Sequence, residues 1–454
     1  MTGVIKTEKI NTNKDQAIVI GGGLAGCEAA WQLSQAGIPV ILYEMKPEKY
    51  SPAHSRQNLA ELVCSNSLKA SRLASAGGLL KAEMKLQGSL LIPCAEACAV
   101  PAGGALAVDR EQFSALVTEK IMQEKLITIV REECTELPEQ NAIIATGPLT
   151  SNVLAEKIES LCGSRLSFFD AAAPIVSAES LDLSKIFLQS RYDRGEADYL
   201  NCPMNREEYE KFWDALVNAE KAELHAHDKA FFKVYEGCMP VEVLASRGMD
   251  TLRFGPLKPV GLRDPRTEKR PYAVVQLRKE NQAATMFNLV GFQTNLKFSE
   301  QKRVFSMIPG LEHAEFLRYG VMHRNFFLNS PELLNPDYSL RNQENLFFAG
   351  QMTGVEGYME SASSGIIAGR SLARKMQGKS AYIPPKDTMT GALAHYVSHG
   401  GAADFQPMGA NMGLLPDLPE RIRGKQERYQ KTAESAIARC TEFLEELELE
   451  NKSL

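Results

Sequence analysis

The sequence lacks the patterns that define several common classes of protein. Its nine cysteines include no C-x-x-C pair, and an odd, scattered set argues against both a disulfide framework and a zinc site. The longest weakly polar stretch, residues 90–108, is interrupted by Pro93, Glu96 and Pro101 and is not expected to span a bilayer. The first fourteen residues contain no apolar run typical of a signal peptide. We therefore expect a cytosolic protein without a bound metal.

An excess of positive charge is also missing. The formal net charge is −5 at pH 7, so any nucleic-acid surface would have to be a local basic patch. A hydrophobic content of 44% and a charged content of 24% are those of an ordinary globular protein. A chain of 454 residues exceeds what one hydrophobic core usually organises, which predicts two or more domains.

What the sequence does contain is a dinucleotide-binding pattern near its start. Residues 17–20 form a short apolar run typical of a buried parallel strand, and a G-x-G-x-x-G motif follows directly. In such a motif Gly21 permits a tight turn, Gly23 lets the backbone approach a pyrophosphate, and Gly26 lets the helix pack on the strand. The phosphates would then bind the N-terminal N–H groups of the helix expected at 24–36.

A carboxylate follows at the end of the next expected strand. Glu44 lies roughly 20 residues beyond the glycines, where a carboxylate can bind both hydroxyls of an adenosine ribose. This spacing predicts a dinucleotide site, and a structural β-α-β unit without a ligand is the alternative. The first set of predicted cofactor-binding residues is Gly21, Gly22, Gly23, Leu24, Ala25, Gly26 and Glu44.

Two more strand ends carry glycine. Residues 141–147 are typical of a strand whose end brings bare backbone up to a ligand, although a simple turn would look the same. Residues 345–361 combine an apolar strand with a glycine-rich loop, before a small-residue helix expected at 361–376. Two glycine-rich turns about 320 residues apart favour FAD over NAD, because only the longer cofactor needs both ends of the chain. These segments add Ala145, Thr146, Gly147, Gly350, Gln351, Gly357 and Glu360 to the predicted cofactor-binding residues.

Cys64 and a basic segment are further candidates. Ser65, Asn66 and Ser67 would cap a helix after Cys64, and the helix dipole would lower the pKa of the thiol. A buried structural cysteine is an equally good interpretation. Between residues 247 and 279, nine basic residues stand against three acidic ones. Phe254 and Tyr272 in that segment are available to stack on RNA bases, although a solvated charged face explains the pattern nearly as well.

The chain contains several longer motifs, at residues 61–68, 78–81, 100–110, 251–262, 323–325 and 405–408. These motifs resemble the TrmFO family of bacterial proteins. That family consists of folate- and FAD-dependent tRNA (uracil-5-)-methyltransferases related to the GidA wobble-uridine enzymes. The resemblance covers nearly the whole chain, from Gln16 to about Pro416.

For the fold we expect an α/β protein with a Rossmann-like, glutathione-reductase-type FAD-binding domain in two sequence segments. The first segment would be residues 16–170, and the second would be residues 325–454, ending in a charged amphipathic helix. An α+β insertion domain at residues 171–324 would bind the RNA substrate. Arg110, which ends one of the matching motifs, is predicted to contact FAD.

The resemblance also implies a reaction, which is methylation of uracil C5 at uridine 54 in the T-loop of tRNA. The family takes the carbon from methylenetetrahydrofolate through the flavin and reduces it with FAD that NADH or NADPH recharges. A thiolate added to C6 makes C5 nucleophilic, and a second group must move the C5 proton. Cys64 lies in the motif at 61–68, and Cys238 lies in the part of the chain that the resemblance covers. Cys238 is assigned as nucleophile and Cys64 as acid/base partner, although the roles could be exchanged. The alternatives are the same chemistry on ribosomal RNA and an NAD(P)H-dependent flavin oxidoreductase acting on a small molecule.

Overall fold

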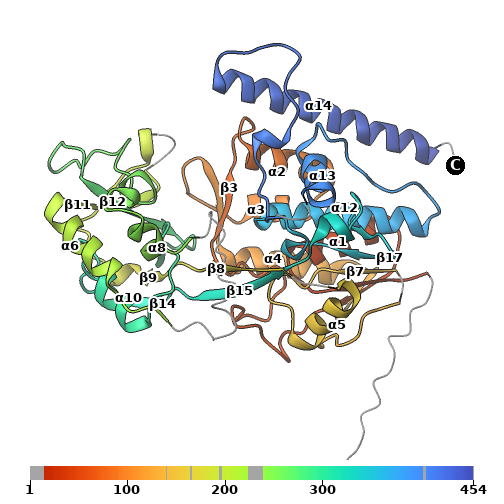
Figure 1. The fold of residues 1–454 in the computed structure, drawn as a ribbon, viewed down its shortest axis with the longest axis horizontal. Coiled ribbons are helices and arrows are strands. Elements are labelled where there is room, and N and C mark those ends of the chain that lie inside the picture. The colour runs from red at the N-terminus through yellow and green to blue at the C-terminus, as the bar shows by residue number, and fades with distance from the viewer. Residues whose placement is uncertain are drawn as a thin grey trace, which may run out of the picture.

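The computed structural model describes residues 15–139, 141–163, 166–193, 197–222, 239–401 and 405–452. Cys238 and the strand expected at residues 230–235 therefore lie outside the described residues. The described chain is an α/β structure that contains a six-stranded, largely parallel sheet and a six-stranded antiparallel sheet. Figure 1 shows the antiparallel sheet in a lobe of its own beside the rest of the molecule. No helix among the described residues is long and apolar enough to cross a membrane.

The parallel sheet contains the strands that the glycine motifs predict. Its order is β16-β17-β7-β1-β2-β6, so strands from both ends of the sequence lie next to each other. β1 is fully buried and pairs with β2 on one side and β7 on the other, and β7 in turn pairs with β17. The parallel members are β1 (Ala17–Ile20), β2 (Val40–Tyr43), β6 (Ile127–Val130), β7 (Ala142–Ile144) and β17 (Gln343–Phe348), with β16 (Ser339–Leu340) antiparallel at the edge.

Two helices pack unusually closely beside this sheet. They are α1 (Leu24–Gln35) and α12 (Tyr358–Met376), the latter beginning three residues before the expected start. A Cβ added to Gly365 would overlap the carbonyl of Ala25, and one added to Gly369 would lie 2.7 Å from the carbonyl oxygen of Ala29. Since both contacts advance by four residues, α1 and α12 run in the same direction. Their N-termini therefore lie at the same end of the sheet.

The antiparallel sheet has its own hydrophobic core, built around Phe212, Phe292 and Phe305. Helices α6 (Arg206–Val217) and α10 (Phe298–Phe305) contribute to that core. The helix expected near residues 206–219 and the strands expected at 272–277 and 285–290 are thereby confirmed. The sheet order is β10 (Phe187–Leu188), β11 (Tyr199–Met204), β12 (Ala273–Lys279), β13 (Met286–Leu289), β9 (Ile175–Ser177) and β14 (Phe316–Arg318).

Two chain crossings connect the lobes. β8 (Leu166–Ala171) leaves the parallel part and β15 (Met322–Phe327) returns to it, and the two strands pair antiparallel along their length (Figure 1). The C-terminal helix α14 (Lys425–Lys452) lies along the outside, where Arg374 donates to Glu450 at 2.6 Å. The domain boundaries at 170/171 and 324/325 stay predictions that fall within these crossing strands.

The helix expected directly after Cys64 is wrong. Residues from Ser67 onward form β3 (Ser67–Ala70), which pairs with β5 (Ala105–Val108) in a small sheet completed by β4 (Ala99–Val100). The reason is tertiary, because the fully buried Asn66 side chain donates to the carbonyls of Val108 and Lys279 instead of capping a helix. The residue that does cap the next helix is Ser75, which accepts from the N–H of Gly78.

The α1–α12 contact makes a prediction about stability. In a helix, alanine is favoured over glycine by about 1 kcal/mol, so helix propensity alone predicts that Gly365→Ala raises the melting temperature. Because the added Cβ would overlap the Ala25 carbonyl, we instead expect a net destabilisation of about 1–3 kcal/mol. Thermal unfolding measures the difference. Gly104→Ala is the control, since a Cβ there meets nothing within 4 Å, and a melting temperature for Gly365→Ala at or above that of the control would contradict the packing.

Candidate functional site

A pocket opens where the carboxyl ends of β1, β2 and β7 meet the N-termini of α1 and α12. The carboxyl edge of an open parallel sheet is the usual place for a ligand. The hollow measures about 1130 Å³ when the open solvent in front of it is included. Segments far apart in sequence line it together, among them Gly21, Gly22, Gly23, Leu24, Ala25, Glu44, Ala145, Thr146, Gly147, Gly350 and Gln351.

Glycine stands at the three motif positions for different physical reasons. Gly21 has a φ of +104°, and a Cβ there would lie 2.5 Å from the carbonyl oxygen of Ala145. A Cβ on Gly26 would overlap the carbonyl of Gly21. A Cβ on Gly23 would meet nothing within 4 Å, and its φ of −76° suits any residue. Gly21 and Gly26 are thus required by the fold, whereas the protein itself leaves room for a side chain at Gly23, which lines the pocket.

Glu44 lines the pocket while its carboxylate accepts two backbone hydrogen bonds. One oxygen accepts from the N–H of Gly22 at 2.9 Å and the other from the N–H of Lys46 at 3.0 Å. These contacts hold the carboxylate beside the glycine turn, where a ribose would lie against it. The ribose contact itself stays a prediction.

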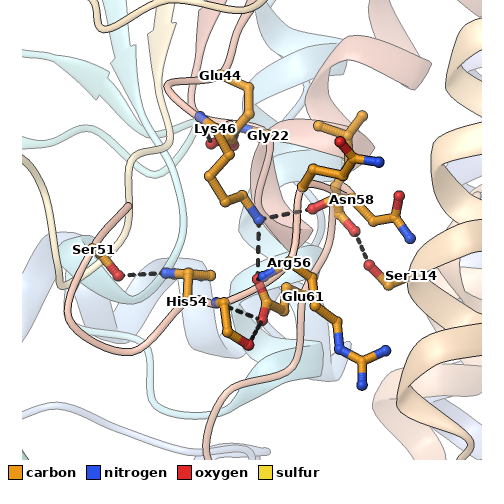
Figure 2. Close-up of polar contacts among 12 residues, drawn as sticks. Gly22, Glu44, Lys46, Ser51, His54, Arg56, Asn58, Glu61 and Ser114 are labelled. Carbon is orange, nitrogen blue, oxygen red and sulfur yellow. Dashed lines mark hydrogen bonds and ion pairs between the residues drawn. The ribbon is translucent and has the colours of Figure 1, made fainter. Parts of the chain in front are cut away.

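A network of hydrogen bonds and an ion pair holds the loop after β2 in place along the same pocket (Figure 2). The Lys46 ammonium donates to the Asn58 carbonyl at 2.7 Å and to Glu61 at 3.2 Å. His54 Nδ1 lies 2.5 Å from the hydroxyl of Ser51. Lys46, His54 and Glu61 all line the pocket, and none of them was predicted. Lys46 and His54 lie in a segment with only a loop signature, since its prolines and polar residues show no periodicity, whereas Glu61 begins the motif at 61–68.

The charge states in this network follow from burial and neighbouring groups. Burial and the positive charge of Lys46 lower the pKa of His54, so its imidazole is neutral at pH 7. Burial opposes ionisation of Glu61, but the hydrogen bond from the Ser55 N–H and the charge of Lys46 outweigh it and lower the pKa of that carboxyl. The ammonium of Lys46 and the carboxylate of Glu61 form a buried ion pair in the pocket wall.

Cys64 lies against the first residue of α12. The hydroxyl oxygen of Tyr358 accepts from the N–H groups of Cys64 at 2.9 Å and Ser65 at 3.2 Å, and it lies 3.1 Å from the Cys64 sulfur. Burial, followed by the neighbouring Cys64, raises the pKa of Tyr358 well above its usual value. Because Tyr358 also lines the pocket, one side chain separates the Cys64 thiol from the glycine turns. Tyr358 was not predicted, although its place directly after Gly357 at the start of a helix was a usable signal.

The other cysteines that the structure describes are buried, whereas Cys64 is partly exposed. Burial raises the pKa of every one of these thiols, so all of them are protonated near neutral pH. Such thiols are inert structural groups. They are Cys27, Cys94, Cys98, Cys134, Cys162, Cys202 and Cys440.

Four of the predicted cofactor residues are not among the residues that line the pocket. Gly26 packs under the turn, and Arg110 forms a 2.6 Å ion pair with Glu280. Glu360 is buried and accepts from the Lys69 ammonium at 2.5 Å and from the Ala410 N–H at 2.9 Å. A Cβ on Gly357 would overlap the Glu360 carboxylate. Direct contact between these four residues and a cofactor stays a prediction.

The basic segment at residues 247–279 is less exposed than its composition suggests. Phe254 is 81% exposed and available for stacking. The Arg253 guanidinium lies 3.6 Å from the ring centroid of Tyr272, and Tyr209 forms an edge-type contact with the same ring. Stacking of Tyr272 on a base stays a prediction. Arg278 is only 6% exposed and contributes nothing to a surface patch.

Comparison with known proteins gives a consistent result. The model of the GIDA family, glucose inhibited division protein A, matches residues 16–380. The methylenetetrahydrofolate--tRNA-(uracil-5-)-methyltransferase TrmFO of Enterococcus faecalis is 58% identical over 420 residues, covering 92% of this chain and 96% of that protein. The TrmFO of Acetivibrio thermocellus is 57% identical over 432 residues, covering 95% of this chain and 99% of that protein. The crystal structure of Aquifex aeolicus GidA in form II superposes with a TM-score of 0.65 at 15% identity, covering 98% of this chain and 78% of that one, which shows a shared fold.

Proposed function

This chain belongs to the TrmFO family, and from that premise we propose that it forms 5-methyluridine in tRNA, at uridine 54 of the T-loop. The carbon comes from methylenetetrahydrofolate. The observation that carries the proposal is the position of Cys64, a partly exposed thiol that contacts Tyr358 in the wall of a dinucleotide-type pocket. A thiol beside such a pocket supplies acid/base chemistry that a simple hydride-transferring enzyme does not need.

We propose FAD as the cofactor because the pocket unites both glycine-rich turns. The N-terminal N–H groups of α1 suit a pyrophosphate, and Gly23 leaves the backbone bare at that point. Glu44 would bind the adenosine ribose, and the turn at Gly350 and Gln351 would contact the remainder of the cofactor. When bound, FAD supplies the two electrons that reduce the transferred carbon from methylene to methyl, and NADH or NADPH restores them.

The protein's own groups act on the uracil. The thiolate of Cys238, outside the described residues, forms a bond to C6 and pushes electron density onto C5. C5 then forms a bond to the methylene carbon while the bond between that carbon and its nitrogen breaks, and C5 gives its proton to the thiolate of Cys64. Loss of the Cys238 thiolate from C6 restores the C5–C6 double bond. Overall, uracil, methylenetetrahydrofolate and two reducing equivalents give 5-methyluracil and tetrahydrofolate.

For the RNA we propose the lobe that contains the antiparallel sheet. The exposed ring of Phe254 lies at the end of a short helix, α9 (Thr251–Phe254), within the basic segment. An exposed aromatic ring beside basic side chains suits a base extruded from an RNA loop, and stacking contributes about 1–3 kcal/mol per base.

The function is tested by incubating the purified protein with methylenetetrahydrofolate, NADPH and an unmodified tRNA transcript. We expect 5-methyluridine by nucleoside mass spectrometry, and no product on a transcript with cytidine in place of uridine 54. Product on ribosomal RNA but not on tRNA would show that ribosomal RNA is the substrate. NADPH turnover that converts a small molecule without any RNA would favour an oxidoreductase.

The cofactor assignment predicts the result of Gly23→Val. The valine side chain would occupy pocket space and leave the fold intact, because a Cβ there meets no protein atom within 4 Å. We therefore expect an unchanged melting transition of the flavin-free protein and at least a tenfold loss of bound flavin, measured by absorbance near 450 nm. Gly104→Val, at a similarly open position outside the pocket, is the control. Flavin retained at the wild-type ratio would show that the dinucleotide does not bind this turn.

The cysteine assignment predicts selective losses of methyl transfer. Cys238→Ala should abolish methylation while flavin binding and NADPH oxidation continue, and Cys64→Ala should remove most activity because the C5 proton has no acceptor. Cys162→Ala, which alters a buried thiol, should stay within about an order of magnitude of wild type.

A tRNA with 5-fluorouridine at the target position separates the two roles. Fluorine cannot leave C5 as a proton does, so wild type should form a trapped covalent complex visible on a denaturing gel. Trapping by Cys238→Ala but not by Cys64→Ala would exchange the roles. Normal methylation by both variants would refute the two-cysteine mechanism.

A further inference from the structure

Three arginines converge on the loop that carries Cys64. Arg110 donates to the Leu62 carbonyl at 3.0 Å, and Arg318 donates to the Val63 carbonyl at 2.6 Å. On the other side of Cys64, Arg278 donates to the Ser65 hydroxyl and to the Asn66 side-chain oxygen, each at 2.8 Å. Cys64 thus lies between residues 62–63 and 65–66, and each of these two pairs accepts hydrogen bonds from guanidinium groups.

The arginines reach the loop from different parts of the fold. Arg110 begins α4 (Arg110–Gln123) next to the parallel sheet. Arg278 lies on β12 and Arg318 on β14, both in the antiparallel sheet. The lobe that contains the antiparallel sheet therefore fixes the position of a thiol at the edge of the other lobe's pocket.

This cluster carries an excess of positive charge. Glu280, which is 3% exposed, is the one carboxylate among the described residues that pairs with any of the three guanidiniums. Two phenols of the described residues also lie in this cluster, Tyr199 beside Arg278 and Tyr358 beside Cys64. The Nε atom of Arg318 is buried without a hydrogen-bond partner in the described structure. Since buried charges need compensation, an anion next to these groups is favoured.

Tyr358 provides a donor to that anion. Its hydroxyl oxygen already accepts from two backbone N–H groups, those of Cys64 and Ser65. Both lone pairs are then used, so the phenol hydrogen is directed to the Cys64 sulfur at 3.1 Å. A sulfur that accepts an O–H hydrogen bond beside uncompensated guanidinium charge is favoured as a thiolate.

We propose that Arg110, Arg278 and Arg318 are positioning residues for Cys64 that fix its loop and, with Tyr358, favour the thiolate form of its side chain. The inference deepens the proposed function and rests on it, because a thiolate is the form of Cys64 that accepts the C5 proton. It also gives the lobe with the antiparallel sheet a second task besides binding RNA. A purely structural cluster would hold the loop without changing the reactivity of the sulfur.

Alkylation of Cys64 separates these two roles. Reduced wild-type protein is treated with iodoacetamide between pH 5 and pH 10, and the label on the Cys64 peptide is followed by mass spectrometry. In Arg318→Met we expect the midpoint of the pH profile to rise by about one unit, with alkylation at pH 7 slower by up to about tenfold. Arg318→Lys keeps the charge and should recover most of the wild-type rate. Arg303→Met is the control, because Arg303 is exposed, pairs with Glu300 and makes no contact with the loop.

Melting temperature and flavin content establish that each variant is folded. If Arg318→Met lowers stability, Arg278→Lys provides a second test, since it keeps the charge but loses the paired hydrogen bonds, and we expect slower methylation with a wild-type pH midpoint for alkylation. A wild-type alkylation profile in folded Arg318→Met would overturn the proposal.

The alkylation result does not depend on methyl transfer. If Cys64→Ala methylated tRNA normally while Arg318→Met still shifted the profile, the acid/base role of Cys64 would be wrong and the electrostatic effect of the cluster would stand. If Cys64→Ala were inactive and the profile did not shift, the role of Cys64 would stand and the positioning by arginine would be wrong.

Discussion

The close, parallel packing of α1 against α12 is the constraint on which the rest of this structure depends. Gly365 and Gly369 allow the backbone of α12 to lie against the carbonyls of Ala25 and Ala29. Because the two helices run in the same direction, the turns that precede them open into one pocket. Segments more than three hundred residues apart in sequence thereby become parts of one site.

The same helix end connects the pocket to the thiol. Tyr358, the first residue of α12, lines the pocket on one side and holds the Cys64 loop on the other. The antiparallel sheet then reaches back to that loop through Arg278 and Arg318. The lobe proposed to bind RNA and the pocket proposed to bind FAD therefore share one short loop, and that loop carries the Cys64 thiol.

The parts of the site that were predictable from the sequence are those governed by local backbone geometry. Gly21 to Ala25, Ala145 to Gly147 and the turn at Gly350 all line the pocket, because glycine-rich strand ends impose the same turn wherever they occur.

Side chains whose place depends on distant segments were not predictable in this way. Lys46 and Glu61 hold each other in place through an ion pair, and no local sequence pattern predicts that pair. The residues after Cys64 have the local sequence of a helix cap but form a strand, because the partners of Asn66 come from residues 108 and 279.

The origin of the methyl hydrogens tests the proposed chemistry most directly. With methylenetetrahydrofolate deuterated at its methylene carbon, unmodified tRNA and NADPH, 5-methyluridine should carry both deuterium atoms in its methyl group. A product without deuterium, or one labelled only from deuterated S-adenosylmethionine, would contradict a folate-dependent transfer.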